Sequence, residues 1–318
     1  MKLNTKLLKD LYMIDHPSGS EQPMISFILN YCKPIPNITF ELDHYNNLFI
    51  TKNTNNPETY ACLLAHTDQI ETNKGPYRVL ELDDMICGIH KSDGSRCGLG
   101  CDDANGICVA LQMLEELPDI KVIFTTEEEC GAKGATEACF NTDFLYDVRY
   151  FLQADRRGSS DLITHTNGIR VVTQEFLNDL SPIMKKYGYS ENAGTYTDVG
   201  ELVENTQICG VNISCGYYSE HTINEYCIIS QLENCLNFIY EILTTLNSEK
   251  QYNIQIPSRY SSNYSYYWDY EDIDDYKIAS EHPTENDFDM SKSDFYDQLP
   301  CDTCRNVDCM NCKFINDY

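Results

Sequence analysis

Short apolar runs and longer stretches of helical spacing alternate along the first 250 residues. The runs have the length and the β-branched or aromatic content of buried strands, and they cover residues 48–51, 60–65, 121–125, 150–154 and 207–214. Helical spacing covers residues 7–12, 24–32, 104–117 and 228–246. Strands that alternate with helices pack as a sheet between two helical layers. The order therefore predicts an α/β fold with a mostly parallel central sheet and helices on both faces.

The alternation ends near residue 250, which predicts three segments. Residues 1–250 form the α/β domain. Residues 251–298 form a flexible, acidic, tyrosine-rich linker, because eleven acids stand against three bases between positions 259 and 298 and neither period persists there. Residues 299–318 form a separate cysteine-containing end. The aromatic side chains of the linker make it a candidate docking segment for a protein partner.

The charge of the chain excludes some classes of partner. With 23 bases and 50 acids among 318 residues, the formal net charge is −27, so a nucleic acid backbone would be repelled. No apolar run reaches eighteen residues, so no membrane span is predicted. Residues 1–12 are amphipathic and charged, without the apolar core of an export signal, and we therefore expect a cytoplasmic protein.

The sixteen cysteines fall into two groups. Twelve are scattered through the first 235 residues, several in apolar runs, and without an export signal we expect them to be reduced thiols, many of them in the core. The last four, Cys301, Cys304, Cys309 and Cys312, form a CxxC-x4-CxxC pattern, which predicts four thiolates around one structural zinc ion. An iron–sulfur site, two disulfides or a disordered reduced tail are the alternatives.

Five acidic or histidine-containing motifs carry the candidate chemistry. AHTD (65–68), GCDDANG (100–106), TTEEECGAKGA (125–135) and QAD (153–155) follow the predicted strands, and SEHTINE (219–225) precedes the last helix. In open parallel sheets, ligands gather beyond the carboxyl ends of the strands. Imidazole and carboxylate groups are ligands that zinc accepts, and two ions can clamp one reacting centre. The motifs therefore predict a site for two divalent ions.

The ligands are assigned by motif. His66, Asp102 and Asp155 hold one ion, and Asp102, Glu129 and His221 hold the other, so that Asp102 bridges the two.

Three further acids receive supporting roles. Asp68 lies two residues after His66, where its carboxylate can accept the free ring N–H and orient the imidazole. Asp103 either supports the site in the same way or caps the following helix. Glu128 lies beside a ligand but is free itself, so it can take a proton from a water between the ions and pass it to the leaving amine.

In these motifs the chain resembles the cocatalytic dizinc exopeptidases, the clan of peptidase T, glutamate carboxypeptidase-like enzymes and the bacterial leucyl aminopeptidases. The resemblance covers residues 3–246 and rests on HTD, GCDDANG, EEECGAKGA, QAD and EHTINE in the family's order. It implies two zinc ions, with manganese or cobalt as alternatives. It also implies an orienting role for Asp68, the role of general base for Glu128, and metal-binding roles for His66, Asp102, Glu129, Asp155 and His221.

The chain departs from many relatives in one respect. They carry a lid or dimerisation domain in one of two intervals, but here only 36 residues separate His66 from Asp102 and 66 separate Asp155 from His221. The chain therefore resembles a lidless, single catalytic domain, for which a monomer is plausible. A tripeptide preference like that of peptidase T does not carry over.

Other interpretations of the same residues stay open. His66 could be a buried structural histidine, and a shift of register by one residue would make Glu127 the base. Asp155 could pair with Arg156 and Arg157, or these arginines could recognise a substrate carboxylate. His90 and His165 lie in polar contexts typical of surface loops, and Thr197 with Asp198 is expected to pack near the site.

The function predicted from these motifs is two-metal hydrolysis of a peptide bond at a chain end, by an aminopeptidase or a di- or tripeptidase. Deacylation of an N-acyl amino acid by the same site is one alternative. A catalytically inactive relative that serves as a binding scaffold is the other, although inactive relatives lose ligands or the base, and here both remain.

Overall fold

Residues 1–71, 75–246 and 249–256 are described by the computed structural model of the chain. Residues 1–92 and 96–256 belong to one unit, and the account below concerns that unit. Of the predicted linker, residues 251–298, the first six are described: Tyr252 is buried, and its backbone forms hydrogen bonds with Arg149 and Cys209. Residues 257–298 and the cysteines Cys301, Cys304, Cys309 and Cys312 lie outside the described residues.

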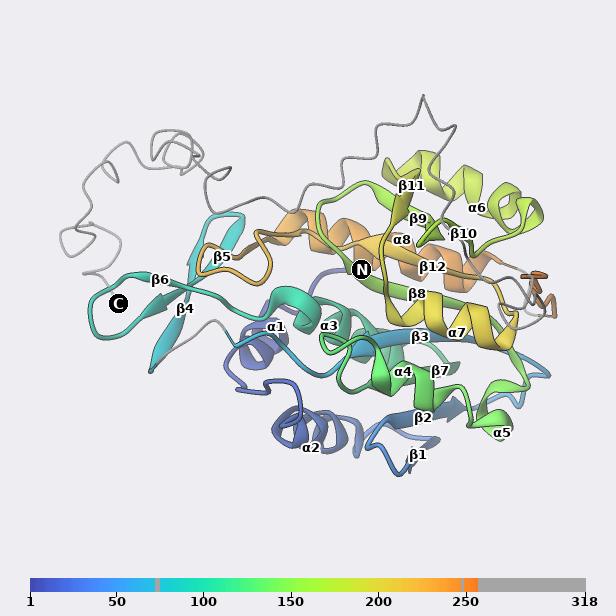
Figure 1. Cartoon of the computed structure of the whole chain (residues 1–318), viewed down its shortest axis with the longest axis horizontal. Helices are drawn as coiled ribbons and strands as arrows, with labels where there is room; N and C mark the ends of the chain where they lie inside the picture. The colour runs from blue at the N-terminus through green and yellow to red at the C-terminus, as the bar shows by residue number, and fades with distance from the viewer. Residues whose placement is uncertain (72–74, 247–248, 257–318) are drawn as a thin grey trace, which may run out of the picture. The chain divides into compact units, whose positions relative to one another are not determined.

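The large sheet of this unit has its parallel strands in the centre (Figure 1). Strands β7, β3, β8 and β12 are neighbours in this order, and each pairs with the next in parallel. On one side the strands β2 and β1 are antiparallel, as are β9 and β10 on the other, while β11 pairs with β9 in parallel. The predicted α/β class is confirmed, and the antiparallel edges are a difference. The bounds are β1 (Ile38–Leu42), β2 (Leu48–Asn53), β3 (Tyr60–His66), β7 (Asp119–Thr125), β8 (Val148–Arg156), β9 (Asp161–Thr166), β10 (Ile169–Arg170), β11 (Ser190–Gly194) and β12 (Gly210–Ser214).

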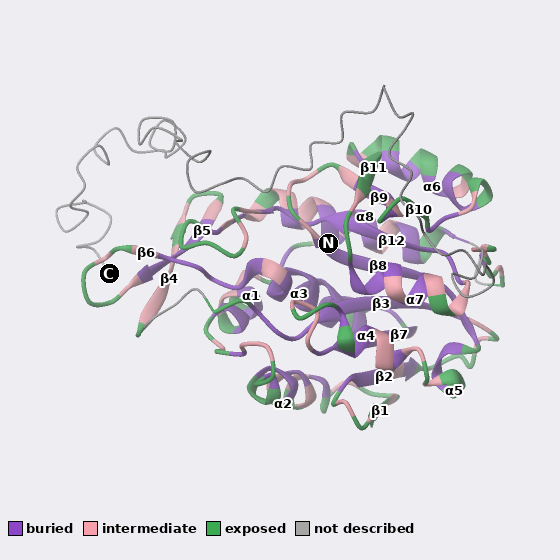
Figure 2. Cartoon of the chain, in the orientation of Figure 1, coloured by how far each residue is buried: buried purple, intermediate pink, exposed green. Residues whose placement is uncertain are grey.

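Helices cover the central strands on both sides, which is why these strands are continuous apolar runs (Figure 2). Helix α3 packs on β3, β7 and β8, and α1, α2 and α8 pack against α3, with α6 beside α8. Helices α4 and α7 pack in front of the sheet in Figure 1, against β7, β8 and β12. The bounds are α1 (Thr5–Tyr12), α2 (Gln22–Cys32), α3 (Cys101–Glu116), α4 (Lys133–Ala138), α5 (Thr142–Leu145), α6 (Gln174–Tyr187), α7 (Asp198–Thr206) and α8 (Ile229–Thr245).

A second, smaller sheet was not predicted from the sequence. It has the order β13-β14-β5-β4, with β6 beside β5. Its strands β4 (Tyr77–Leu82), β5 (Met85–His90) and β6 (Arg96–Cys97) lie between β3 and α3 in the chain, whereas β13 (Tyr217–Tyr218) and β14 (Tyr226–Ile228) lie between β12 and α8. Because β14 pairs with β5, two distant segments of the chain meet next to the start of α3.

The described cysteines were expected to be reduced, many of them in the core, and no membrane-spanning segment was expected. The twelve described cysteines are free, and ten of them are buried, which confirms the prediction of reduced thiols in the core. In the described part of the chain, no helix combines the length and the apolar character needed to cross a bilayer.

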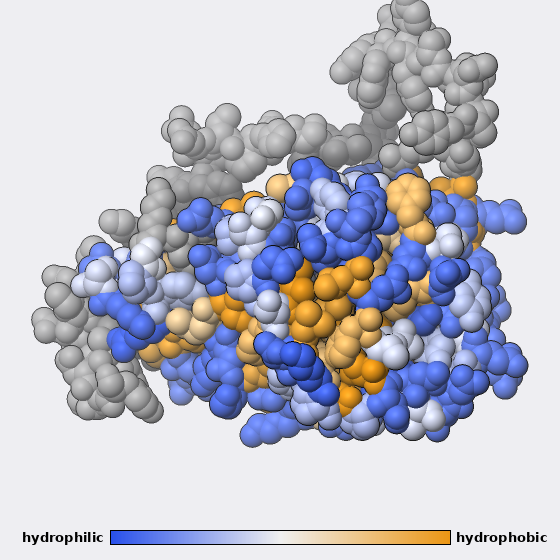
Figure 3. Space-filling view, turned by 90° about the horizontal axis from the view of Figure 1, so that it is seen from below, coloured by the Kyte–Doolittle hydropathy of each residue, from blue (hydrophilic) through white to orange (hydrophobic). Residues whose placement is uncertain are grey.

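Apolar side chains reach the surface at the edge of the large sheet. Phe40 and Leu42 are 39% and 49% exposed, and they lie on the same side of β1 because they are two residues apart. Figure 3 shows an apolar patch on this face, over α2 and β1. An exposed edge strand with apolar side chains is a surface on which another strand could pair.

Candidate metal centre

The predicted ligands come from segments that end at one edge of the large sheet. His66 is the last residue of β3, and Asp155 lies near the end of β8. Glu129 lies in the loop after β7, and Asp102 lies in the first turn of α3. His221 belongs to the connection between β13 and β14 in the small sheet. The structure brings all five side chains together, because β3, β7 and β8 are parallel and the small sheet joins the remaining two segments to them.

Asp102 lies between the two histidines. One of its oxygens, Oδ1, is 2.8 Å from His66 Nε2, and the other, Oδ2, is 3.3 Å from His221 Nε2. His66 Nε2 is also 3.6 Å from Asp155 Oδ1, and His221 Nε2 is 2.6 Å from Glu129 Oε1. This arrangement has one carboxylate shared by two histidine–carboxylate pairs, which is the pattern that a bridging ligand requires.

The donor set fits a pair of divalent ions. Ligand atoms of Asp102, Glu129 and His221 all lie within 4.8 Å of one another. Glu129 Oε1 is buried, and His221 Nε2 lies 2.6 Å from it. A buried carboxylate is costly unless a cation compensates its charge. Imidazoles and carboxylates together suit zinc and also manganese or cobalt.

Ligand atoms of His66, Asp103 and Asp155 also lie within 4.8 Å of one another. From the sequence, Asp102, not Asp103, was assigned to the ion held by His66 and Asp155. The Asp103 carboxylate, however, already accepts backbone N–H groups, with Oδ1 2.9 Å from Gly106 N and Oδ2 3.3 Å from His66 N. Asp102 and Asp103 have non-helical φ and ψ angles, so the regular part of α3 begins after them. Asp103 therefore caps this helix, one of its two expected roles, while the carboxylate of Asp102 faces the two histidines.

The two histidines hold protons more tightly than free imidazole does. Hydrogen bonds to Asp102 and Glu129 raise the pKa of His221 to about 11. Burial alone would lower the pKa of His66, but hydrogen bonds to Asp102, Asp155 and Asp68 outweigh it, so that the pKa is raised well above its ordinary value. At neutral pH the imidazole of His221 is therefore protonated in the metal-free protein, and an ion must displace this proton.

We therefore expect metal binding to weaken as the pH falls. The pKa of His221 lies above neutral pH and that of His66 is shifted in the same direction, so ion binding releases protons, and the affinity should drop roughly tenfold per pH unit for each proton displaced. Calorimetric titration of zinc in two buffers with different ionisation enthalpies would measure the number of protons released. Equal heats in the two buffers at neutral pH would show that no proton is displaced.

Asp68 joins His66 to the loop after β7. Its carboxylate accepts the backbone N–H groups of Glu128 (Oδ1, 2.9 Å) and Glu129 (Oδ2, 3.2 Å) and the hydroxyl of Ser18 (2.7 Å). His66 Nδ1 is 3.3 Å from Asp68 Oδ1, but the backbone oxygen of Asp68 is nearer, at 3.0 Å. Burial opposes ionisation of Asp68, yet the contacts with His66 and Ser18 lower its pKa overall. Asp68 thus lies behind the ring as predicted, and it also fixes the Glu128–Glu129 backbone.

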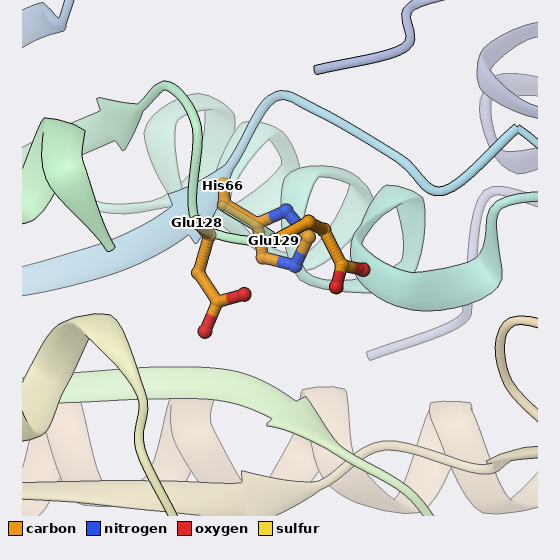
Figure 4. A group of neighbouring side chains, drawn as sticks. All are labelled: His66, Glu128 and Glu129. Atoms are coloured by element: carbon orange, nitrogen blue, oxygen red, sulfur yellow. The ribbon is translucent and has the colours of Figure 1, made fainter. Parts of the chain in front are cut away.

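Glu127 and Glu128 have different environments. Glu127 accepts a hydrogen bond from Tyr45 (3.0 Å) and pairs with Lys133 (2.8 Å), whereas Glu128 lines the cavity of the site. Figure 4 shows Glu128 and Glu129 leaving the same loop with diverging carboxylates. Burial raises the pKa of Glu128 well above its ordinary value. A carboxylate with a raised pKa is a better base near neutral pH, so the geometry favours Glu128 over Glu127.

Polar side chains that the sequence interpretation missed hold Asp155 in place. Gln153 donates to Asp155 Oδ2 (3.0 Å), and its own oxygen accepts from Thr197 Oγ1 (2.8 Å). Asn212 Oδ1 accepts from Asp155 N (3.0 Å), and its amide donates to Asp155 O (2.8 Å). Gln153 and Asn212 are polar amides within otherwise apolar strands, and this exception to the apolar pattern could have indicated a role in the site.

Tyr217 also contacts the site, and no motif predicted it. Its hydroxyl is 3.2 Å from Asp102 Oδ2 and 3.5 Å from Asp155 Oδ1. Burial raises the pKa of this phenol well above its ordinary value, and the charge of Asp102 adds to the effect. Tyr217 therefore stays a hydrogen-bond donor to the two carboxylates.

The arginines after Asp155 pair with other acids. Arg156 Nε is 3.4 Å from Asp161, and Arg157 Nη1 is 2.8 Å from Glu220, while both arginines line the cavity. The interpretation in which Asp155 serves as their partner is thus disfavoured. The cavity has a volume of about 250 Å³.

Thr197 lines the cavity, as its expected position near the site implied, whereas Asp198 is buried and accepts a hydrogen bond from Thr125. Burial raises the pKa of Asp198 to about 7. His90 and His165, expected in surface loops, are half-buried at or near the ends of β5 and β9, so that expectation was wrong.

Solved structures of several peptidases share this fold. The aminopeptidase PepT from Bacillus cereus matches with a TM-score of 0.65 and 13% identity over 76% of this chain and 98% of its own. A tripeptidase from Staphylococcus aureus matches with a TM-score of 0.61 and 15% identity over 76% and 98%. The TET1 peptidase of Pyrococcus horikoshii, which can assemble into a tetrahedron or a large octahedral shell, matches with a TM-score of 0.56 and 15% identity over 76% and 99%. The predicted resemblance is confirmed at the level of the fold.

No family model matches the chain, and no curated protein sequence is similar to it. At such low identity the likeness concerns the fold, and the chemistry has to be argued from the residues of this chain.

Proposed function

We propose that this protein is a two-metal exopeptidase that hydrolyses a peptide bond at a chain end. The observation that carries the proposal is the convergence of His66, Asp155, Asp102, Glu129 and His221, with the Glu128 carboxylate beside them, within 4.8 Å of ligand atoms of His66 and Glu129. The fold shared with known aminopeptidases and a tripeptidase supports it.

In the proposed reaction, five side chains would bind the ions and Glu128 transfers a proton. His66, Asp102 and Asp155 would hold one ion, and Asp102, Glu129 and His221 the other. When bound, the two ions would supply Lewis acidity and make a water molecule between them more acidic. Glu128 takes the proton of this water on its carboxylate as the oxygen attacks the peptide carbonyl carbon. The same carboxylate then gives the proton to the nitrogen as the C–N bond breaks, so that one water is consumed and an amine and an acid are released.

A substrate panel tests the proposal. The purified chain is supplied with zinc, manganese or cobalt and offered dipeptides, tripeptides, aminoacyl-anilides and N-acetyl amino acids. We expect turnover of substrates with a free α-amine. Turnover of the N-acetyl amino acids alone would instead assign a deacylase. If no substrate reacts with any metal although two ions bind, the peptidase proposal is wrong and the metal site remains.

The C-terminal cysteines lead to a separate proposal. Because two CxxC pairs can surround one zinc ion, we expect the full chain to bind one more zinc ion than a chain that ends at residue 256. Elemental analysis of both proteins after dialysis against trace zinc measures the difference. Equal zinc contents would contradict a zinc site formed by Cys301, Cys304, Cys309 and Cys312.

The remaining assignments follow from the proposed activity and the composition. A peptide is the proposed substrate, the cytoplasm the proposed compartment, and a monomer the proposed state. The assembly of the TET1 peptidase shows that this fold also occurs in large oligomers, so the mass of the protein in solution decides the last point.

A further inference from the structure

A buried glutamate outside the predicted ligand set joins two parts of the metal centre. Glu225 lies between His221 and β14 and is only 2% exposed. Its carboxylate accepts backbone N–H groups from four consecutive residues. Oε2 is 2.7 Å from the nitrogens of both Leu99 and Gly100, while Oε1 is 2.9 Å from that of Cys101 and 3.4 Å from that of Asp102.

These N–H groups need an acceptor because they lie in the buried turn that precedes the regular part of α3. A buried backbone N–H group without a partner is costly, and successive N–H groups that face one point attract an anion. Gly100 has a φ of 66°, in the left-handed region, and the chain turns there into α3. The Glu225 carboxylate therefore accepts hydrogen bonds from the N–H groups of the turn and complements their partial positive charge. These hydrogen bonds hold the backbone of Asp102 in place.

Glu225 is also fixed from its own side. It follows His221 by four residues in the same connection, and its backbone N–H bonds to Thr222 O (3.3 Å). Its backbone oxygen accepts from Arg96 Nη2 (3.0 Å). One side chain thus links the segment that carries His221 to the segment that carries Asp102. The distance between these two ligands, 3.3 Å from His221 Nε2 to Asp102 Oδ2, depends on how the two segments are held.

We propose that Glu225 is a positioning residue for the metal centre, which holds the backbone of Asp102 in the register that lets its carboxylate face both His66 and His221. This inference rests on the proposed metal-binding roles of Asp102 and His221. It predicts that a change at Glu225 acts first on the affinity and geometry of the bound ions and only through them on turnover.

The variant Glu225→Gln tests the proposal in the full chain. The glutamine keeps the size of the side chain, but its NH₂ group would face two N–H donors, so about half of the hydrogen bonds are lost. Removing a residue that orients a metal ligand typically costs about 10- to 100-fold in metal affinity. We expect a fall of this size for Co²⁺, followed by its visible absorption, and an altered absorption spectrum of the bound ion. Cobalt on the tail thiolates is distinguished by its sulfur charge-transfer bands in the near ultraviolet.

A matched control removes a similar carboxylate elsewhere. Asp119, at the start of β7, accepts the backbone N–H groups of Thr54 (2.7 Å) and Asn55 (2.8 Å), and Asp119→Asn makes the same loss of charge. The metal centre lies at the C-terminal end of β7, whereas Asp119 is the first residue of this strand. The Co²⁺ affinity and the absorption spectrum of the Asp119→Asn variant should therefore equal those of the unchanged protein. Should Glu225→Gln fail to fold, Glu225→Asp, which keeps the charge but is one methylene shorter, is measured in its place and should also bind Co²⁺ more weakly.

Each outcome separates this inference from the proposed function. If the unchanged protein binds no ion at the centre, the metal site and the proposed function fall together with the inference. If it binds Co²⁺ and Glu225→Gln binds equally well with the same spectrum, only the inference is overturned. A variant that melts earlier but has unchanged affinity well below its melting temperature would likewise show a merely structural role.

Discussion

Glu128→Gln is expected to lower kcat by at least about 100-fold, because a positioned general base contributes roughly this much or more to a proton transfer. The amide cannot take the proton of the attacking water. KM and metal content should change little, since Glu128 is not assigned to either ion and its side chain diverges from Glu129. The measurement is steady-state turnover of the best substrate of the panel, together with elemental analysis of the same sample.

Glu127→Gln is the matched control for this experiment. It removes the same charge one residue away, but Glu127 is occupied by Tyr45 and Lys133 rather than by the site. Its turnover should stay close to that of the unchanged protein. If Glu127→Gln is inactive and Glu128→Gln is active, the base has been assigned to the wrong residue and the alternative register is correct.

Asp102→Asn is expected to abolish turnover and to weaken metal binding by more than about 100-fold, the upper end of what the loss of an orienting residue costs. The reason is that Asp102 is the only predicted ligand shared by the two ions, and the amide offers one oxygen where the carboxylate offers two. Both ions should be affected, whereas loss of a ligand specific to one ion should spare the other. Zinc titration with a chromophoric chelator as competitor measures the affinities.

Asp143→Asn provides the comparison for this variant. Asp143 is exposed in the first turn of α5, so the substitution makes the same change of charge outside the site. Its metal affinity and turnover should not change. An Asp102→Asn protein that still binds two ions tightly would contradict the bridging role.

The local patterns in the sequence predict the central part of this fold well. The runs at 60–65, 121–125 and 150–154 correspond to β3, β7 and β8, because strands buried on both faces leave continuous apolar runs. The ligands at their ends could be predicted for the same reason, since parallel strands place their carboxyl ends at one edge. The helix that begins after Asp103 was predicted from its spacing and its capping residue.

The edges of the fold could not be predicted in the same way. Strands β4, β5, β13 and β14 are short or half-exposed, and the pairing of β14 with β5 joins segments more than 100 residues apart, which local patterns do not encode. Gln153 and Glu225 stand in the motifs QAD and SEHTINE but received no role, while Asn212 and Tyr217 lie outside the motifs. Asn212, Tyr217 and Glu225 act on residues more than 50 positions away, and local patterns do not encode such contacts.

The close packing of acidic side chains in the metal centre affects the stability of the folded protein. Burial raises the pKa of Asp103, Asp155 and Glu128 well above its ordinary value, so ionising these three carboxyl groups costs folding free energy until cations compensate the charges. Ions that bind the folded chain but not the unfolded one stabilise it by about 2.7 kcal/mol when their free concentration is about 100 times the dissociation constant. Metal supply would then govern not only how fast this protein works but also how long each molecule survives heat and proteolysis.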